Sequence, residues 1–439
     1  MQSFIIALLL LLVIIVYKYK KDIIIYLPLV NIFLDLSLNF FQGSGKTSTG
    51  LSIPAAIRLS IYLIIVGAFV KHFGRAKFPK FFWVFSIYIF ILCFFSSDIF
   101  ISLKNYTQLI LSLLMFPIGY LYFSDDYKLK KFLQIAKFAL LIYITSLVLG
   151  NFFGIGTINF GYSGIEESVG FFSSGSIYAG SVLVALLPIF LLFDKKKSTR
   201  MITIIMGIFF ILGVLFTARR TSIMIPFIGL FVFLFFSKMK AKIILMFIIG
   251  TISFLLISPF ILDRLTERLA VRAEAGRFDV NSYEQEARYF DLVNAWNQAT
   301  NFDEPLDALF GTNIFAEGGW RYGVKIGRII HNDYAVFLQG GGIIGLILYL
   351  VMILSILFIN KFQLYKIRKF KYNIYYTSII CLIAILLAVS LNGGYNIISY
   401  RALLFLLLGA FVRLLSSQKT KEENARKIKK SFSREYSFT

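Results

Sequence analysis

The sequence predicts an all-α protein that crosses a membrane many times, and two observations predict this fold class: its composition and its long apolar runs. Hydrophobic residues make up 58% of the 439 residues, charged residues make up 15%, and the mean hydropathy is +0.78. A water-soluble protein of this size could not cover so much apolar surface with polar side chains. We therefore exclude a soluble fold.

Apolar runs of roughly 16 to 25 residues, the length that a helix needs to cross a bilayer, recur along the whole chain. They predict about 12 or 13 membrane-spanning helices. The predicted spans are 2–17, 23–41, 54–70, 81–97, 107–123, 132–152, 176–193, 201–217, 222–237, 243–261, 333–359, 374–390 and 397–415.

Positive charge predicts the orientation of these spans. Alternate connections carry most of the lysines and arginines, and such connections lie on the cytoplasmic side of membrane proteins. They are 18–21, 71–80, 128–131, 195–200, 238–242, 361–371 and the tail after Arg413. The predicted domains are an N-terminal helix bundle (1–261), an extracytoplasmic loop domain (262–332), C-terminal helices (333–415) and a basic cytoplasmic tail (416–439).

The net charge of +22 follows from this distribution and needs no nucleic-acid partner, because the basic loops and tail lie near anionic lipid headgroups. Cys93 and Cys381 both fall within predicted spans. They therefore imply neither a disulfide framework nor a metal cluster.

The connection 262–332 differs from all others, with eight basic and eleven acidic side chains. Arg264, Arg268 and Arg272 recur every four residues and form a basic ladder on one helix face, which is either a solvated face or a surface for an anionic glycolipid. A second helix is expected from Asn281 or Ser282 to about Thr300. Its apolar stripe of Tyr289, Val293 and Trp296 predicts the packed face, with Arg288 beside it.

His331 lies where this loop re-enters the membrane, whereas the only other histidine, His72, is in a predicted cytoplasmic connection. Histidine is the side chain best suited to accept a proton near neutral pH. The alternative is an interfacial residue next to a helix cap formed by Asn332 or Asp333.

Arginines at the outer membrane surface are a further signal. Arg219 and Arg220 lie in the short connection between spans 201–217 and 222–237, on the side that positive charge normally avoids. Arginine binds phosphate through two parallel hydrogen bonds, so we expect one of the pair to bind an anion. Within the spans, Asp35 has two candidate partners, Arg58 and Arg401.

Four segments carry a resemblance to the superfamily of O-antigen polymerases and O-antigen ligases. The most specific is "HNDYAVFLQGGGIIGLILYL", with Gly342 and Gly345 ahead of an apolar helix. The segments "ARYFDLVNAW" (287–296), "EPLDALFGTNIF" (304–315) and "FTARRTSIMIPFIGL" (216–230) are also similar to family motifs. Together they cover roughly residues 210–350, in the family's order.

The resemblance implies a GT-C-like fold and glycosyl transfer without a metal ion or another cofactor, which agrees with the lack of a DxD motif. His331 would be the catalytic base, and Arg288 with Arg219 or Arg220 would bind the diphosphate of an undecaprenyl-linked oligosaccharide donor. Further contacts to the glycan or the lipid headgroup are expected from Arg272, Trp320, Arg321 and Arg328. The implied partners are this donor, a glycan acceptor, the lipid bilayer and a chain-length regulator.

Three functions follow as alternatives. The first is a surface-polysaccharide polymerase in the bacterial inner membrane, which the Phe-, Ile- and Lys-rich composition favours. The second is a ligase that transfers the glycan to lipid A–core. The third is a glycolipid flippase, for which internal repeats and broken helices near the membrane midplane would be typical.

Overall fold

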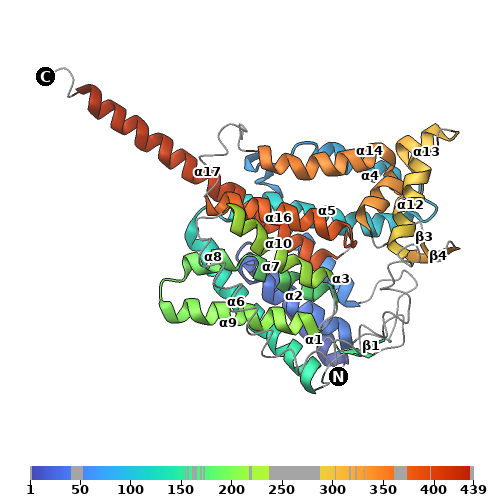
Figure 1. Ribbon diagram of the computed structural model, residues 1–439, viewed down its shortest axis with the longest axis horizontal. Coiled ribbons are helices and arrows are strands. Elements are labelled where there is room, and N and C mark those ends of the chain that lie inside the picture. Colours follow the sequence, from blue (N-terminus) through green and yellow to red (C-terminus); the bar gives the residue numbers. More distant parts are fainter. Residues whose placement is uncertain are drawn as a thin grey trace.

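The computed structural model describes residues 2–40, 53–153, 155, 158–160, 166–168, 171, 174–216, 220–236, 287–301, 303–315, 318–321, 324–330, 332–359, 373–395 and 397–435. These residues are mostly helical and form one layered bundle (Figure 1). The first six α-helices are α1 (Gln2–Tyr19), α2 (Ile23–Phe40), α3 (Ile53–Val70), α4 (Phe82–Cys93), α5 (Ile99–Tyr122) and α6 (Asp126–Phe153), with the short 3-10 helix η1 (Phe73–Arg75) between α3 and α4.

The middle of the chain adds α7 (Ser174–Ala185), α8 (Leu187–Phe193), α9 (Lys197–Phe216) and α10 (Arg220–Phe236). The remaining helices are α12 (Ala287–Ala299), α13 (Pro305–Phe310), α14 (Asp333–Ser355), η3 (Ile356–Phe358), α16 (Ile374–Ser390) and α17 (Ile398–Glu435). Each predicted span coincides with one of these helices except 243–261, which lies outside the described residues, and 176–193, which is divided into α7 and α8.

Five of the described helices are long and apolar enough to cross a membrane: α5, α6, α9, α14 with η3, and α17. Shorter apolar helices include α2, α4 and α16. Large apolar side chains also point outward, such as Phe100, which is 85% exposed, and Phe231, which is 63% exposed. An exposed apolar surface of this kind is suited to lipid rather than to water. The chain is therefore an α-helical, membrane-embedded protein with several spans.

Two short antiparallel hairpins interrupt the helical pattern. The first joins β1 (Ile158–Phe160) to β2 (Glu166–Ser168), and the second joins β3 (Gly318–Arg321) to β4 (Val324–Ile329). The fold is therefore mostly but not entirely helical, because residues 318–321 and 324–329 of the polar loop form strands. Glycines flank this hairpin and Val324 and Ile326 alternate with Lys325 in β4, a pattern that favours a strand over a helix.

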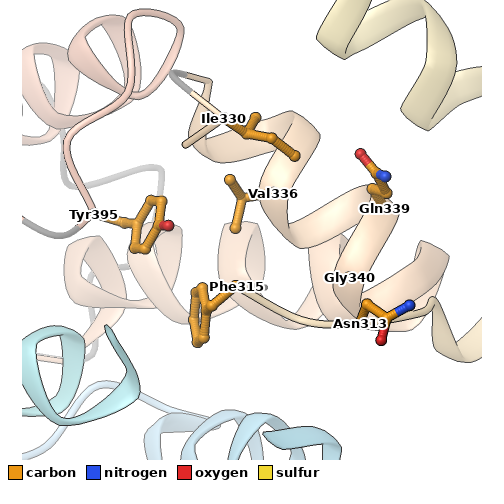
Figure 2. A pocket seen from close by; sticks show the side chains of 7 residues that line it. All are labelled: Asn313, Phe315, Ile330, Val336, Gln339, Gly340 and Tyr395. Carbon is orange, nitrogen blue, oxygen red and sulfur yellow. The ribbon is translucent and has the colours of Figure 1, made fainter. Parts of the chain in front are cut away.

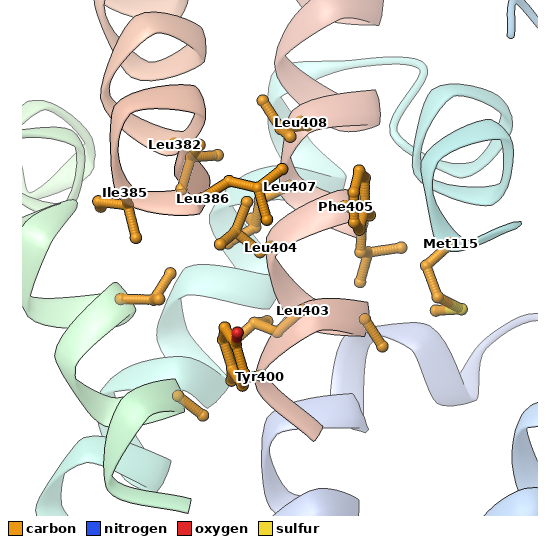
Figure 3. Close-up of a cluster of buried hydrophobic side chains, with 14 of the residues drawn as sticks. Met115, Leu382, Ile385, Leu386, Tyr400, Leu403, Leu404, Phe405, Leu407 and Leu408 are labelled. Atoms are coloured by element: carbon orange, nitrogen blue, oxygen red, sulfur yellow. The ribbon is translucent and has the colours of Figure 1, made fainter. Parts of the chain in front are cut away.

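Helix α17 forms the core of the bundle, and nearly all of its apolar stretch is buried. Figure 3 shows its leucines packed towards α16, and Phe405 on the side of Met115 from α5. Helices α5 and α17 approach at two glycines: a Cβ on Gly119 would overlap the backbone of Leu406, and a Cβ on Gly409 would overlap that of Phe116. Small residues allow such close packing between membrane helices.

Buried ion pairs add polar contacts inside the bundle. The predicted pairing of Asp35 is confirmed for Arg58, whose guanidinium donates to the Asp35 carboxylate. Nearby, the Tyr62 hydroxyl donates to Asn31 Oδ1 at 3.0 Å, and Asn31 Nδ2 donates to the Ser399 carbonyl oxygen at 3.2 Å. This network connects α2 and α3 to the first turn of α17.

The described basic connections gather at one end of the bundle, and α12, α13, β3 and β4 lie at the other end, on the right in Figure 1. Hydrogen bonds join connections and helix ends at the basic end: Lys21 Nζ to His72 Nε2 at 2.9 Å, Ser355 Oγ to the Lys80 carbonyl oxygen at 3.3 Å, and Tyr375 OH to Asp126 Oδ1 at 2.7 Å. The polar loop and the basic connections therefore face opposite ways.

Candidate functional site

The candidate site lies around the first residues of α14. Asn332 caps the helix, because its Oδ1 accepts a hydrogen bond from the backbone N–H of Ala335 at 3.2 Å. This confirms the predicted cap. Asn332 is 3% exposed and Ile330 is 5% exposed. His331, which the chain carries between them, lies outside the described residues.

An ion pair fixes the first residue of α14 inside the bundle. The Asp333 carboxylate accepts from the Arg401 guanidinium of α17 and from the backbone N–H of Tyr395 at 3.0 Å. The same guanidinium donates to Tyr349 OH at 3.1 Å, and Tyr349 OH lies 2.8 Å from Ser390 Oγ. Arg401 therefore pairs with Asp333, and not with Asp35, which was the candidate partner that the sequence offered.

Helix α12 packs against α14. Gln298 Nε2 donates to the carbonyl oxygen of Gln339 in α14 and to Thr312 Oγ1, both at 3.1 Å. The buried face of α12 consists of Asp291, Ala295 and Ala299. Small side chains let the two helices approach closely.

This arrangement corrects the predicted packed face of α12. Tyr289 is 40% exposed and Trp296 is 61% exposed, so the apolar stripe faces outward. The described helix ends at Ala299, next to the predicted end, and begins at Ala287. Arg288 belongs to its first turn. The structure describes the backbone of this arginine but not its side chain.

The helix α14 is broken at Gly342, where φ is 62° and ψ is −170°. A Cβ at this position would overlap the carbonyl of Leu309, and a Cβ on Gly311, at φ 72°, would overlap the backbone of Gly342. The end of α13 therefore fits into the break in α14, and both glycines are required by the close approach of two backbones. The segment before the break, 333–341, is a separate short helix under α12 and α13.

A small pocket with room for about one water molecule lies beside this short helix (Figure 2). Its lining combines two amide side chains with aromatic and aliphatic ones: Asn313, Phe315, Ile330, Val336, Gln339, Gly340 and Tyr395. The rings of Phe315 and Tyr395 are stacked with centroids 5.0 Å apart. Burial raises the pKa of the Tyr395 hydroxyl well above its usual range, so this group stays neutral and able to donate.

Only one of the two predicted arginines, Arg220, belongs to the described residues. Arg219 lies outside the described residues, and Arg220 is the first residue of α10, described without its side chain. Contacts show which end of the bundle this is. The Ser222 carbonyl oxygen accepts from Ser181 Oγ of α7 at 2.9 Å, and Tyr178 of α7 lies edge-to-face with Tyr400 at 5.6 Å. Because Tyr400 precedes Arg401, α10 begins at the same end of the bundle as α14.

The hairpin supplies the backbone of three further predicted contact residues. Trp320 and Arg321 belong to β3, where Trp320 is opposite Lys325 and Arg321 is opposite Val324. Arg328 is opposite Gly319 across a register shift. Strand β3 contacts α12. The elements that carry Arg288, Trp320 and Arg321 are therefore in contact, whereas Arg272 lies outside the described residues.

Two features of this site were missed by the sequence reasoning: the Asp333–Arg401 pair and the buried side chain of Gln339. The signal for the first was an arginine in an apolar span, which requires a buried partner. For Gln339 the signal was its place seven residues after Asn332, which puts both on one face of a helix.

The fold and this site define the class: an α-helical, multi-span membrane protein with a small polar, partly aromatic pocket at the end opposite its basic connections. Comparison of the chain with protein-family models, with curated proteins and with solved structures finds no match.

Proposed function

We propose that this protein is a membrane glycosyltransferase that joins undecaprenyl-diphosphate-linked oligosaccharide repeat units, a surface-polysaccharide polymerase. In this proposal the basic end of the bundle is cytoplasmic by the positive-inside rule. The pocket then faces the periplasm from the bacterial inner membrane. A GT-C-like arrangement of about 12 or 13 spans belongs to the same proposal.

The observation that carries the proposal is the packing of α12 on the first segment of α14. Helix α12 begins with Ala287 and Arg288, and α14 begins two residues after His331. The arginine and the histidine, which the sequence singled out separately, thus belong to or directly adjoin two elements in contact.

The proposed reaction needs one base and a cationic site for the leaving group. The acceptor hydroxyl oxygen attacks C1 of the donor sugar, and the bond from C1 to the diphosphate oxygen breaks. His331 takes the hydroxyl proton. Negative charge grows on the departing diphosphate, and Arg288 with Arg219 or Arg220 neutralises it.

The break in α14 does not favour the transporter alternative. Broken helices of transporters line a substrate path near the membrane midplane. Here the backbone of α13 occupies the break, since a Cβ on Gly342 would overlap Leu309. The break holds protein rather than substrate.

Glycan analysis of a strain that lacks the gene tests the proposal. We expect single repeat units on lipid A–core, the product left when elongation fails. Lipid-linked polymer with bare core would instead indicate a ligase. Lipid-linked repeat units that stay on the cytoplasmic side of the inner membrane would indicate a flippase.

The base is tested by complementing that strain with His331→Ala, which should insert normally but abolish glycan elongation. The matched control is His72→Ala, since His72 lies at the basic end beside Lys21. Elongation at the wild-type level with His331→Ala would contradict the mechanism. Arg288→Lys should also be severe, because lysine lacks the planar two-hydrogen fork.

A further inference from the structure

We propose that α13 and the turn between α4 and α5 (residues 94–98) form a membrane-embedded edge, whose exposed apolar side chains are covered by lipid of the leaflet opposite the basic end. The sequence predicts that α13 belongs to a loop domain outside the membrane, whereas in this arrangement it lies within the bilayer. The side chains of the edge are Phe94, Phe95, Phe100, Leu306, Leu309 and Phe310.

The first argument is the short distance from the basic end to the edge. Helix α4 has 12 residues and rises about 18 Å, less than the hydrocarbon layer of about 30 Å. It begins at the basic end, where Ser355 Oγ donates to the Lys80 carbonyl oxygen. The part of α14 and η3 beyond Gly342 rises roughly 25 Å from the same end. The turn after α4, and α13, which packs at Gly342, therefore lie within the thickness of this layer.

The second argument is that the edge continues an apolar surface suited to lipid. Helix α14 with η3 is long and apolar enough to cross a membrane, and α4 packs beside it. Both helices expose apolar residues at helical spacing: Ile343, Ile347, Val351 and Leu354 in α14, and Trp83, Ile87 and Ile91 in α4. Phe94 and Phe95 extend the surface of α4 at its outer end, and Phe95 is 77% exposed. Helix α13 packs at the outer end of α14 (Figure 1).

The third argument is the pattern of α13 itself. Leu306, Leu309 and Phe310 are spaced as neighbours on one helix face, and all three are exposed. Leu306, at 69%, is the most exposed of them. The exposed acidic residues Asp303 and Glu304 come directly before the helix. Apolar residues on one face and charges at one end are suited to a helix that lies at the boundary between headgroups and acyl chains.

The fourth argument is that non-helical backbone at the edge finds hydrogen-bond partners within the protein. Lipid offers none, so irregular backbone lies at membrane depth only where the protein supplies partners. The Asp98 carboxylate, the charged group of the turn, accepts from the Ile101 N–H at 2.9 Å and caps α5. Three further hydrogen bonds join the turn and its helices to the chain around α13 and α14: Ser97 N–H to Asn313 Oδ1 at 2.7 Å, Ser102 Oγ to the Ile314 carbonyl oxygen at 2.5 Å, and Tyr88 OH to the Gly341 carbonyl oxygen at 2.6 Å.

The edge has one consequence that rests on the proposed function, although the embedding itself does not. Helix α13 packs on α14, which begins two residues after His331. A lipid-linked donor keeps its diphosphate at the headgroup level, where α13 would lie. The donor would therefore approach the proposed base sideways, without leaving the bilayer.

Site-directed fluorescence tests the edge without measuring glycan transfer. Leu306→Cys and Phe95→Cys are each introduced into the full chain, labelled with an environment-sensitive fluorophore and reconstituted in phosphatidylcholine nanodiscs. Quenching is measured with nitroxide-labelled phosphatidylcholine in the disc and with iodide in the buffer. Cys93 and Cys381 are buried, so the wild-type protein is the blank for labelling.

We expect the lipid nitroxide to quench both labels as strongly as a label on Ile347→Cys in α14, and iodide to quench them only weakly. A nitroxide near the headgroup should quench the label at position 306 more than one at the end of the acyl chain, because interfacial helices lie only about 5–10 Å inside the boundary. The matched control is Asp303→Cys, at the exposed residue just before α13, where iodide should quench more than lipid.

Stronger quenching by iodide than by lipid at Leu306→Cys and Phe95→Cys would place the edge in water and overturn the proposal. Protection from both quenchers would assign the face to a protein partner, such as a second copy of the chain, and would overturn it equally. If one variant does not fold, as judged by size-exclusion chromatography, the other decides. Failure of the proposed function would appear in the glycan analysis of the deletion strain and would leave the quenching result unchanged.

Discussion

The carboxylate of Asp333 and the guanidinium of Arg401 form an ion pair inside the bundle, and neither side chain has any solvent exposure. The two residues are 68 positions apart in the sequence. The pair joins the first residue of α14 to the first turn of α17, whose apolar stretch is the most buried among the five long apolar helices. It therefore fixes the segment that follows His331 to the core of the bundle.

Removing one partner of this pair should be strongly destabilising. Asp333→Asn leaves the Arg401 charge buried without a counter-ion, which costs about 3–5 kcal/mol. We expect a large drop in the Tm of the detergent-purified protein. The control is Asp303→Asn, since Asp303 is exposed and its neutralisation should change Tm little.

The double variant Asp333→Asn with Arg401→Gln tests whether the contact itself matters. Two neutral amides leave no isolated charge, so this protein should be more stable than either single variant. Additive losses from the two substitutions would show that the residues act independently and would contradict the pairing.

Gly342→Ala should disrupt the junction between α13 and α14. At φ 62° and ψ −170° a non-glycine residue costs about 1–3 kcal/mol, and its Cβ would also overlap Leu309. We expect a lower Tm and impaired glycan elongation, because the short helix that follows His331 must shift. Gly67→Ala is the control: no atom lies within 4 Å of a Cβ there, and alanine in a helix gains about 0.5–1 kcal/mol.

Gly409→Val should separate α17 from α5. Its side chain would overlap the Phe116 carbonyl, and overpacking of this kind costs about 1–3 kcal/mol or more. The yield of folded protein after size-exclusion chromatography measures the effect. Gly74→Val, at a position with open space around it, should keep the wild-type yield. Equal yields for the two variants would contradict the close contact between the helices.

The environment of Asp125, at the basic end, predicts that the stability of the fold depends on pH. Its pKa is held below its usual value chiefly by the hydrogen bond from the Lys128 backbone N–H, at 3.0 Å. A carboxyl whose pKa is lower in the folded state stabilises the fold above its unfolded pKa, and loses this contribution as pH falls through the folded pKa. Asp125→Ala should therefore lower Tm at pH 7, and the difference from wild type should shrink below about pH 3.8. A constant difference would show that ionisation of Asp125 has no role.

Much of the helical framework could be predicted from local sequence. Apolar runs located the described helices to within a few residues at most ends, because a helix in lipid must be apolar over its whole length. The cap at Asn332 and the end of α12 are also local features. The pairing of Asp35 with Arg58 was one of two alternatives, since both charges lie in neighbouring helices.

Tertiary contacts decided the rest. The packed face of α12 could not be read from its aromatic stripe, because α12 docks through Ala295 and Ala299, and exposed aromatic rings are common at a membrane interface. The break at Gly342 depends on α13, whose backbone occupies the space. Sequence alone also could not match Arg401 to Asp333 across 68 residues. The functional roles assigned to His331, Arg219 and Arg272 stay predictions.

The burial of α17 has a consequence for how the protein is made. Synthesis proceeds from the N-terminus, so the helices around α17 leave the ribosome before it does. Until it arrives, Phe116 and Gly119 of α5 lack their partner surface and Arg401 is not yet available to neutralise Asp333. Completion of the bundle is therefore a late event in biogenesis. A chain that stops before Ile398 would present an open, charged interior to the cellular machinery that removes unfinished membrane proteins.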